Sequence, residues 1–185
     1  NIFKSVKSEI KDGSKNNLKI IDIKVEERPT GEISAGAGIG TSGGAIAFGI
    51  KENNWLGTGK SVEFQMDLDE ESLTGVLSLN DPNYDYLGNS LNYFIRSESN
   101  DKPDQGYENS VVSAGIGSSF KQFKDLTASI GASFTYDDLR TFDTASSSLK
   151  KQSGKFNELS ANYGFTYDKR NRAFMPTSGT ITSFS

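Results

Sequence analysis

Apolar and polar residues alternate with a period of two along most of the chain. The clearest case is residues 61–69, where Val62, Phe64, Met66 and Leu68 alternate with Glu63, Gln65, Asp67 and Asp69. Because successive side chains of a β-strand point to opposite faces of a sheet, this pattern predicts strands with one apolar face. Similar segments lie at 31–41, 45–50, 73–79, 91–96, 112–117, 126–136 and 159–167, and a ninth strand begins near Thr180. No long segment keeps helical spacing, which predicts an all-β protein.

The order of these segments predicts an antiparallel up-and-down meander. Alternation fits both a soluble β-sandwich and a transmembrane β-barrel. Simple hairpin order, small residues on the non-apolar face and aromatic residues near strand ends favour the barrel. Several segments approach the roughly 9–11 residues with which a tilted strand crosses a bilayer. Long polar connections are expected at 97–108 and 137–155, both at one end of the sheet.

The first 30 residues have a different pattern. Residues 2–10 and 18–27 are strand-like, and the second run is continuously apolar, as in a strand of a small soluble module packed under helices. We therefore expect one module at 1–30, with its linker, and a partial barrel at 31–185. The chain begins with Asn1 and ends within a predicted strand, so we expect a piece of a longer protein.

The amino-acid composition excludes several kinds of catalytic and metal-binding site. The 185 residues carry a net charge of −4 and contain no His and no Cys. A Ser-His-Asp triad, a thiol nucleophile, a Cys/His zinc site and disulfides are therefore excluded. Net acidity argues against nucleic acid as a partner. We expect no enzyme activity, no cofactor and no metal. The mean hydropathy of −0.52 does not exclude a barrel, whose strands are half polar.

Four features resemble catalytic or ligand-binding motifs. Gly38–Gly43 matches a dinucleotide fingerprint and Gly57–Ser61 resembles a phosphate loop, but a strand rather than a helix is expected after each. Asp81–Asp85 begins like a calcium loop but has Tyr86 where the invariant Gly belongs, so a turn is expected. The acidic row at 63–69 is best interpreted as solvated residues on the polar face of a strand.

Four motifs, in order, resemble the BamA family of outer-membrane assembly factors, which belongs to the POTRA-plus-barrel (bacterial surface antigen) superfamily. Val25–Gly31 resembles the junction between the last POTRA module and the first barrel strand. Three turn motifs of the family are matched by Asn54, Trp55, Gly57 and Gly59, by Asp81 and Pro82, and by Asp168, Arg170, Pro176 and Gly179. The resemblance covers nearly the whole chain.

The resemblance implies a 16-stranded barrel after POTRA modules, with this chain holding the end of the last module and about nine strands. It implies that the first barrel strand is the edge of a lateral gate that templates client strands. That strand comprises Gly31, Glu32, Ile33, Ser34, Ala35, Gly36, Ala37, Gly38, Ile39, Gly40 and Thr41. Its glycines weaken strand pairing, as a seam that opens requires.

The resemblance also implies partners and a location. The partners are unfolded outer-membrane proteins, accessory assembly lipoproteins and outer-membrane lipid. The location is the outer membrane of a Gram-negative bacterium, with the N-terminal part in the periplasm. Two alternatives within the superfamily are a two-partner secretion transporter and the translocation and assembly module protein. A porin-like channel is disfavoured, because a porin would lack the junction at 25–31 and the hairpin before it.

Overall fold

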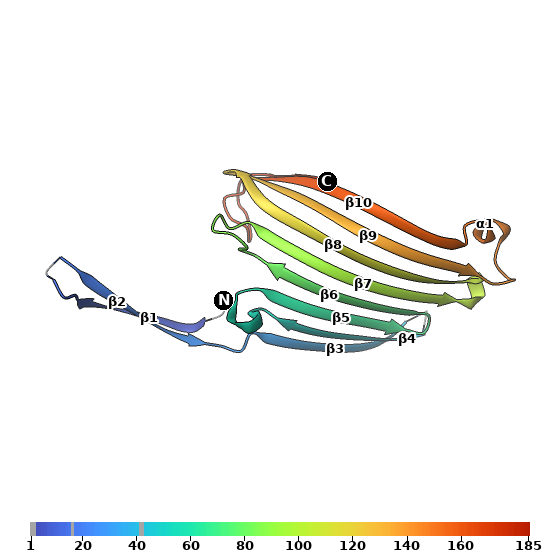
Figure 1. Ribbon diagram of the computed structural model, residues 1–185, viewed down its shortest axis with the longest axis horizontal. Helices are drawn as coiled ribbons and strands as arrows, with labels where there is room; N and C mark the ends of the chain where they lie inside the picture. Colours follow the sequence, from blue (N-terminus) through green and yellow to red (C-terminus); the bar gives the residue numbers. More distant parts are fainter. Residues whose placement is uncertain (1–2, 16, 41–42) are drawn as a thin grey trace.

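The computed structural model describes residues 3–15, 17–40 and 43–185. Its strands form two antiparallel sheets: a hairpin of β1 (Phe3–Asp12) and β2 (Lys19–Glu27), and a nine-stranded sheet. The large sheet runs in sequence order from β3 to β11, so every neighbouring pair is a hairpin (Figure 1). Its strands are β3 (Gly31–Gly40), β4 (Gly43–Glu52), β5 (Ser61–Asp69), β6 (Ser72–Asp81), β7 (Ser90–Lys102), β8 (Tyr107–Phe123), β9 (Leu126–Thr141), β10 (Gly154–Asp168) and β11 (Ile181–Phe184).

The all-β up-and-down prediction is confirmed. The helical turns in the described residues are η1 (Trp55–Gly57), η2 (Pro103–Gln105) and α1 (Ser147–Lys150). Within the described ranges, no helix combines the length and the apolar character that crossing a membrane would need. The sheet is curved but not closed, because β3 and β11 lie at its two edges (Figure 1).

The register aligns apolar residues across eight strands. The row starts at Ile33 and passes through Ile50, Phe64, Leu77, Ile95, Ala114 and Phe134 to Leu159. These side chains cover no core, since Leu159 is 81% exposed and the only buried apolar residues in the described ranges are Ala128 and Ala145. The sheet therefore presents a continuous apolar face outward.

This apolar face runs diagonally across the sheet. On β3 it extends from Ile33 to Ile39, toward the β3–β4 turn, whereas on β10 it extends from Leu159 to Phe165, toward the other end. Ile33 and Leu159 share one row, so the band shifts by six residues over seven strand-to-strand steps. With strand spacings and rises typical of sheets, this shift corresponds to strands tilted by about 30° from the band's normal. Tilted strands are what a barrel requires.

The opposite face carries small residues beneath larger neighbours. A Cβ on Gly115 would lie 2.4 Å from Phe94 Cε1, and one on Gly117 would lie 2.8 Å from Asn92 Oδ1. Asn162 covers Gly131 in the same way. Side chains of one strand thus fill the space that glycines leave on the next, and these glycines have a packing role.

The prediction of long polar connections at 97–108 and 137–155 is mostly wrong. β7 continues to Lys102 and β8 starts at Tyr107, leaving only a short turn built around η2. Cross-strand polar pairs extend this ladder, such as Asn100 Nδ2 donating to Asn109 Oδ1 at 3.0 Å. β9 likewise runs to Thr141 and β10 starts at Gly154. The strands continue as polar ribbons beyond the apolar band, where apolar alternation no longer marks them.

The N-terminal hairpin is amphipathic and extends away from the large sheet at the end where β3 begins (Figure 1). One face aligns Val6 with Val25 and Ile10 with Ile21, and these four side chains are exposed. The other face is ionic, with Lys11 Nζ 3.0 Å from Asp22 Oδ2.

A pair of glycine substitutions tests the packing of the polar face. In the full-length protein, Gly115→Val is expected to lower stability by about 1–3 kcal/mol, because the new side chain meets the Phe94 ring and the carbonyl oxygen of Ala132. Gly75→Val, on the apolar face of β6, is the control for adding the same side chain without a clash, since a Cβ there meets nothing within 4 Å. The midpoint of urea unfolding compares them, and equal midpoints would contradict this packing.

Candidate functional site

The distinctive chemical feature of the sheet is the open edge of β3. In the described part of the chain, β3 pairs with β4 on one side and with nothing on the other. The backbone N–H of Asn53 donates to the carbonyl oxygen of Thr30 at 3.3 Å, and these residues face each other one step before the β3–β4 register begins. This bond fixes which backbone groups of β3 point toward β4.

Hydrogen-bonded and non-hydrogen-bonded pairs alternate along an antiparallel ladder. Thr30 is bonded to β4, so the even-numbered residues from Glu32 to Gly40 also direct their N–H and C=O groups to β4. The odd-numbered residues direct theirs to the open edge: Gly31, Ile33, Ala35, Ala37 and Ile39. The open edge therefore presents the backbone N–H and C=O groups of five residues. The side chains of these same residues lie on the apolar face.

The second half of β3 has almost no side-chain support. Cβ atoms built on Gly36, Gly38 and Gly40 would meet nothing within 4 Å, unlike those on the covered glycines of the inner strands. Ile33 is 76% exposed and Ile39 is 94% exposed. Backbone pairing with β4 is thus the main contact that holds this half. The remaining predicted gate residue, Thr41, lies outside the described residues.

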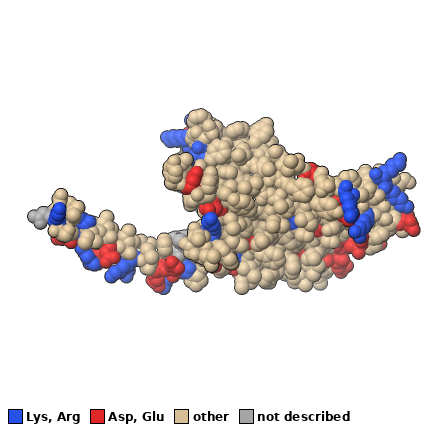
Figure 2. Space-filling model, in the orientation of Figure 1, with Lys and Arg blue, Asp and Glu red and all other residues tan. Residues whose placement is uncertain are grey.

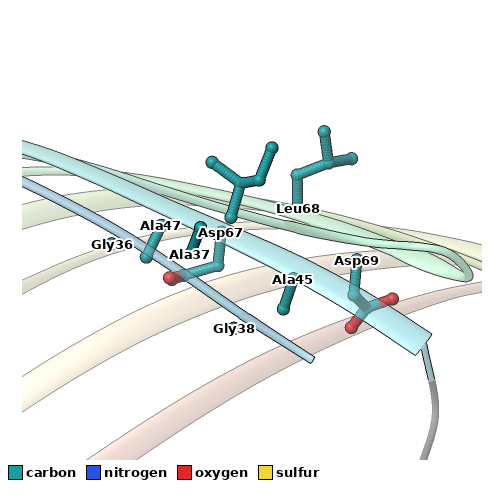
Figure 3. Close-up of a pocket in the computed structure, with 9 residues that line it drawn as sticks. Gly36, Ala37, Gly38, Ala45, Ala47, Asp67, Leu68 and Asp69 are labelled. Carbon is teal, nitrogen blue, oxygen red and sulfur yellow. The ribbon is translucent and has the colours of Figure 1, made fainter. Parts of the chain in front are cut away.

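A shallow cavity lies over these glycines. It is lined by Gly36 and Gly38 of β3, Ala45 and Ala47 of β4, and the carboxylates of β5 (Figure 3). Asp67 and Asp69 point to the side of the sheet where Ala45 and Ala47 lie, and Leu68 points to the other (Figure 3). The small side chains leave this part of the polar face hollow.

The acidic row on β5 does not form a paired-carboxylate site. Glu63 faces Lys51 at 3.1 Å and accepts a hydrogen bond from Gln65. Asp69 instead accepts from the backbone N–H groups of Glu71 and Ser72 and shapes the β5–β6 turn. Glu63 and Asp69 each have a structural partner, and the row fits solvated residues on the polar face. Nor does the described part of the chain bring together three or more acidic residues that could hold a metal ion.

Charged residues appear in patches at the ends of the strands and on the hairpin, while the middle of the visible face is largely uncharged (Figure 2). Outward-facing ion pairs above the apolar band include Arg140 with Glu108 and Asp138, each at 3.2 Å. This separation of charge from the central band is the arrangement of a barrel with a lipid-facing zone.

The first two turn motifs lie at the end of the sheet where the hairpin joins. Asn54 Oδ1 accepts from the N–H of Gly59 at 2.7 Å, and Gly57 and Gly59 have φ near +74° and +73°. Trp55 N–H donates to the carbonyl oxygen of Lys60. Lys60 Nζ lies 3.1 Å from Asp81 Oδ2, which joins this turn to the one that contains Asp81 and Pro82.

That second turn is organised by carboxylates. Asp81 accepts from the N–H of Asn83 at 3.3 Å, and Asp85 accepts from the N–H groups of Leu87 and Asn89. Partial desolvation opposes ionisation of Asp85. The hydrogen bonds from the backbone and side chain of Asn89 outweigh it and hold the pKa of Asp85 below its ordinary value. The calcium-loop resemblance is thus a turn, as predicted.

The third turn motif connects β10 and β11. Asp168 binds Arg170 at both carboxylate oxygens, at 2.9 and 2.7 Å, and this pairing raises the pKa of the Arg170 guanidinium above its ordinary value. Gly179 has φ +95° and lies where a Cβ would be 2.1 Å from the carbonyl oxygen of Lys169. Pro176 lies within the same turn, after Met175 at φ +48°. The N–H of Asp168 also donates to Asp125 of the β8–β9 turn.

The structure therefore brings the three turn motifs and Thr30, in the junction at 25–31, to one end of the sheet, whereas β3, the predicted gate strand, runs away from that end. It also shows residues that sequence reasoning missed. Glu52 and Asn53 form side-chain hydrogen bonds with Thr30. No pattern in the sequence distinguishes them from other polar residues at strand ends.

A curved antiparallel sheet with an apolar outer band, small residues on its inner face and turns gathered at one end defines the class of outer-membrane β-barrel proteins. A profile of the Omp85 superfamily domain matches residues 54–185. The chain belongs to the Omp85 superfamily.

Two relatives within this class are similar to the chain. The outer membrane protein assembly factor BamA of Neisseria meningitidis serogroup B (strain ATCC BAA-335 / MC58) is 29% identical over 112 residues, which are 60% of this chain and 13% of that protein. The crystal structure of BamA from Haemophilus ducreyi lacking POTRA domains 1–3 superimposes with a TM-score of 0.71 and 25% identity. That match covers 98% of this chain and 38% of the other, so the chain spans well under half of either relative.

Substitutions of two turn glycines, Gly57 and Gly179, test how tightly the turn between β10 and β11 is packed. In the full-length protein, Gly179→Ala is expected to cost more stability than Gly57→Ala, because it adds a backbone clash to an unfavourable φ. Gly57→Ala carries only the conformational penalty, about 1 kcal/mol, since nothing lies within 4 Å. Urea unfolding measures both, and an equal loss would show that the turn relaxes around the new side chain.

Proposed function

We propose that this chain is the first part of an outer-membrane barrel that assembles other barrels, and that the edge of β3 is its working part. The observation that carries the proposal is the row of outward-directed backbone groups on Gly31, Ile33, Ala35, Ala37 and Ile39. The similarity to BamA proteins supports outer-membrane protein assembly as the process.

The physical argument concerns the cost of an open edge in lipid. A strand entering hydrocarbon with unpaired N–H and C=O groups loses several kcal/mol for each. An assembly factor that lends a free edge satisfies those groups by β-augmentation and lowers the barrier to insertion. Such a role needs no catalytic residue, cofactor or metal. The odd-numbered residues of β3 suit it, because they combine edge-directed backbone with apolar side chains.

The separation of the chain into two sheets supports a domain boundary near residue 30. We propose that residues 1–30 are the end of a POTRA module with its linker, and residues 31–185 the partial barrel. The exposed apolar face of the hairpin supports this, because Val6, Ile10, Ile21 and Val25 need a covering layer that the described residues do not supply. The hairpin would lie in the periplasm, next to the motif turns.

The partners of this function are unfolded outer-membrane proteins, accessory assembly lipoproteins and outer-membrane lipid. Lipid is supported by the apolar band, and clients by the open edge. A superfamily transporter would carry a single client through the lumen instead. Such a transporter would keep working with β3 locked to its neighbours, which separates the two functions experimentally.

Locking the edge strand tests the gate. In the full-length protein, replacing Gly36 and Gly38 by Val is expected to strengthen β3 pairing and impair client assembly without unfolding the barrel. Space is available, because Cβ atoms at both positions meet nothing within 4 Å. β-branched residues also favour strands. The rate of client folding into proteoliposomes measures the effect.

Gly75→Val is the matched control for this experiment. Gly75 also has open space, but it lies on β6, which is paired on both sides. It should leave client assembly at the wild-type rate. Wild-type assembly by the Gly36/Gly38 variant would remove the gate argument.

A charge placed on the apolar band tests its contact with lipid. Ala161→Arg in the full-length barrel is expected to cost about 2–4 kcal/mol of folding free energy in a bilayer, because Ala161 lies in the middle part of the apolar band on β10. Ser160→Arg is the control, because Ser160 is the adjacent residue on the polar face. Urea titrations of folding into phospholipid bilayers compare them, and equal costs would exclude a lipid-facing band.

A further inference from the structure

The edge strand is supported very unevenly along its length. Around its first residues, Thr30, Glu52, Asn53 and Asn54 are each half-buried, whereas every residue of β3 itself is exposed. In the described part of β3, side-chain hydrogen bonds to the neighbouring strand region occur only at this first end. The strand that would act as the gate is thus fixed at one end and loosely held along its glycine half.

Three residues make the fixed end. The Thr30 hydroxyl donates to Glu52 Oε1, and Asn53 Nδ2 donates to the carbonyl oxygen of Thr30 at 3.0 Å. Asn53 Nδ2 also lies 3.3 Å from Glu32 Oε1, so one amide group contacts residues on both sides of Gly31. Thr30, Glu52 and Asn53 are called the base clamp below.

Glu52 also connects the base clamp to the first turn motif. Its Oε1 accepts from the N–H of Asn54 at 2.8 Å, while its Oε2 lies 3.3 Å from where a Cβ on Gly31 would be. The carboxylate therefore bridges the junction, the start of β3 and the Asn54–Gly59 turn. A shift of β3 along β4 by even one residue would break these contacts and move the apolar side chains to the other face.

We propose that Glu52 and Asn53 are positioning residues that fix the base and the register of β3, and so confine opening of the edge strand to its glycine half. This inference rests on the proposed function only in naming β3 as a gate. The clamp itself is a property of the free protein. Its consequence is that the position of the N-terminal module and the register offered to a client strand are set by the same contacts.

Hydrogen exchange resolved to single amides, in the full-length protein in lipid without client, tests the clamp. The N–H groups of Glu32 and Ser34 bond to β4 and are expected to exchange more slowly than those of Gly36 and Gly38. Glu52→Ala should speed exchange at Glu32 and Ser34 about tenfold, the effect of losing a hydrogen bond to a charged group. Glu52→Gln keeps an acceptor oxygen and should stay near the wild-type rate.

Two further variants separate the clamp from general damage. Thr30→Val removes only the hydroxyl donor and leaves the Glu52–Asn54 bond, so it should also speed exchange at Glu32 and Ser34. Asp85→Ala is the matched control: Asp85 lies in the turn after β6 at the same end of the sheet and, like Glu52, accepts from the N–H two residues on, but its hydrogen bonds stay within its own turn. It should leave β3 exchange unchanged.

The clamp is overturned if Glu52→Ala and Thr30→Val leave exchange at Glu32 and Ser34 unchanged, or if Asp85→Ala raises it equally. Client assembly, measured separately with the same variants, addresses the proposed function. Faster exchange together with unaltered assembly would leave the clamp standing and count against the edge of β3 as the working part.

Discussion

The structure depends on satisfying backbone hydrogen bonds in a sheet that has almost no core of its own. With only Ala128 and Ala145 buried among apolar residues of the described ranges, side-chain packing contributes little. The ladder from β3 to β11 holds the strands together, and in lipid each missing ladder bond costs several kcal/mol. Where the ladder stops therefore matters more than any single side chain, and in the described residues it stops at β3 and at β11.

The remaining features follow from this constraint. A ladder that must curve and tilt needs an apolar face that shifts along the strands, and the band from Ile33 to Leu159 does so. Curvature brings inner-face side chains together, and glycines such as Gly115 under Phe94 relieve the crowding. On β3, Gly36, Gly38 and Gly40 have no such neighbour, so the same residue type that permits packing in the inner strands leaves this half of the edge strand weakly held.

Much of this arrangement could be predicted from the sequence. The alternation predicted both ends of β5 correctly, because four polar residues from Glu63 to Asp69 alternate strictly with four apolar residues from Val62 to Leu68. The same criterion ended β7 too early and started β8 too late, since beyond Ile95 and before Val112 the ladder is made by polar pairs such as Asn100 with Asn109. The motif turns could be found because turn geometry requires particular residues, such as glycine at the positive φ of Gly179. Glu52 and Asn53 could not, because their role depends on a junction residue, Thr30, that only the folded register places beside them.

The central claim is that the free edge of β3 pairs with a client strand, and disulfide scanning tests it most directly. Single cysteines at Ile33, Ala35, Ala37 and Ile39 of the full-length protein are combined with single cysteines along the terminal strand of a stalled client. The account predicts one dominant cross-link for each position, moving along the client in step with the β3 position. Cross-links that show no register, or that are no stronger than those from a cysteine at Leu77, which is on the same face of the fully paired β6, would contradict it.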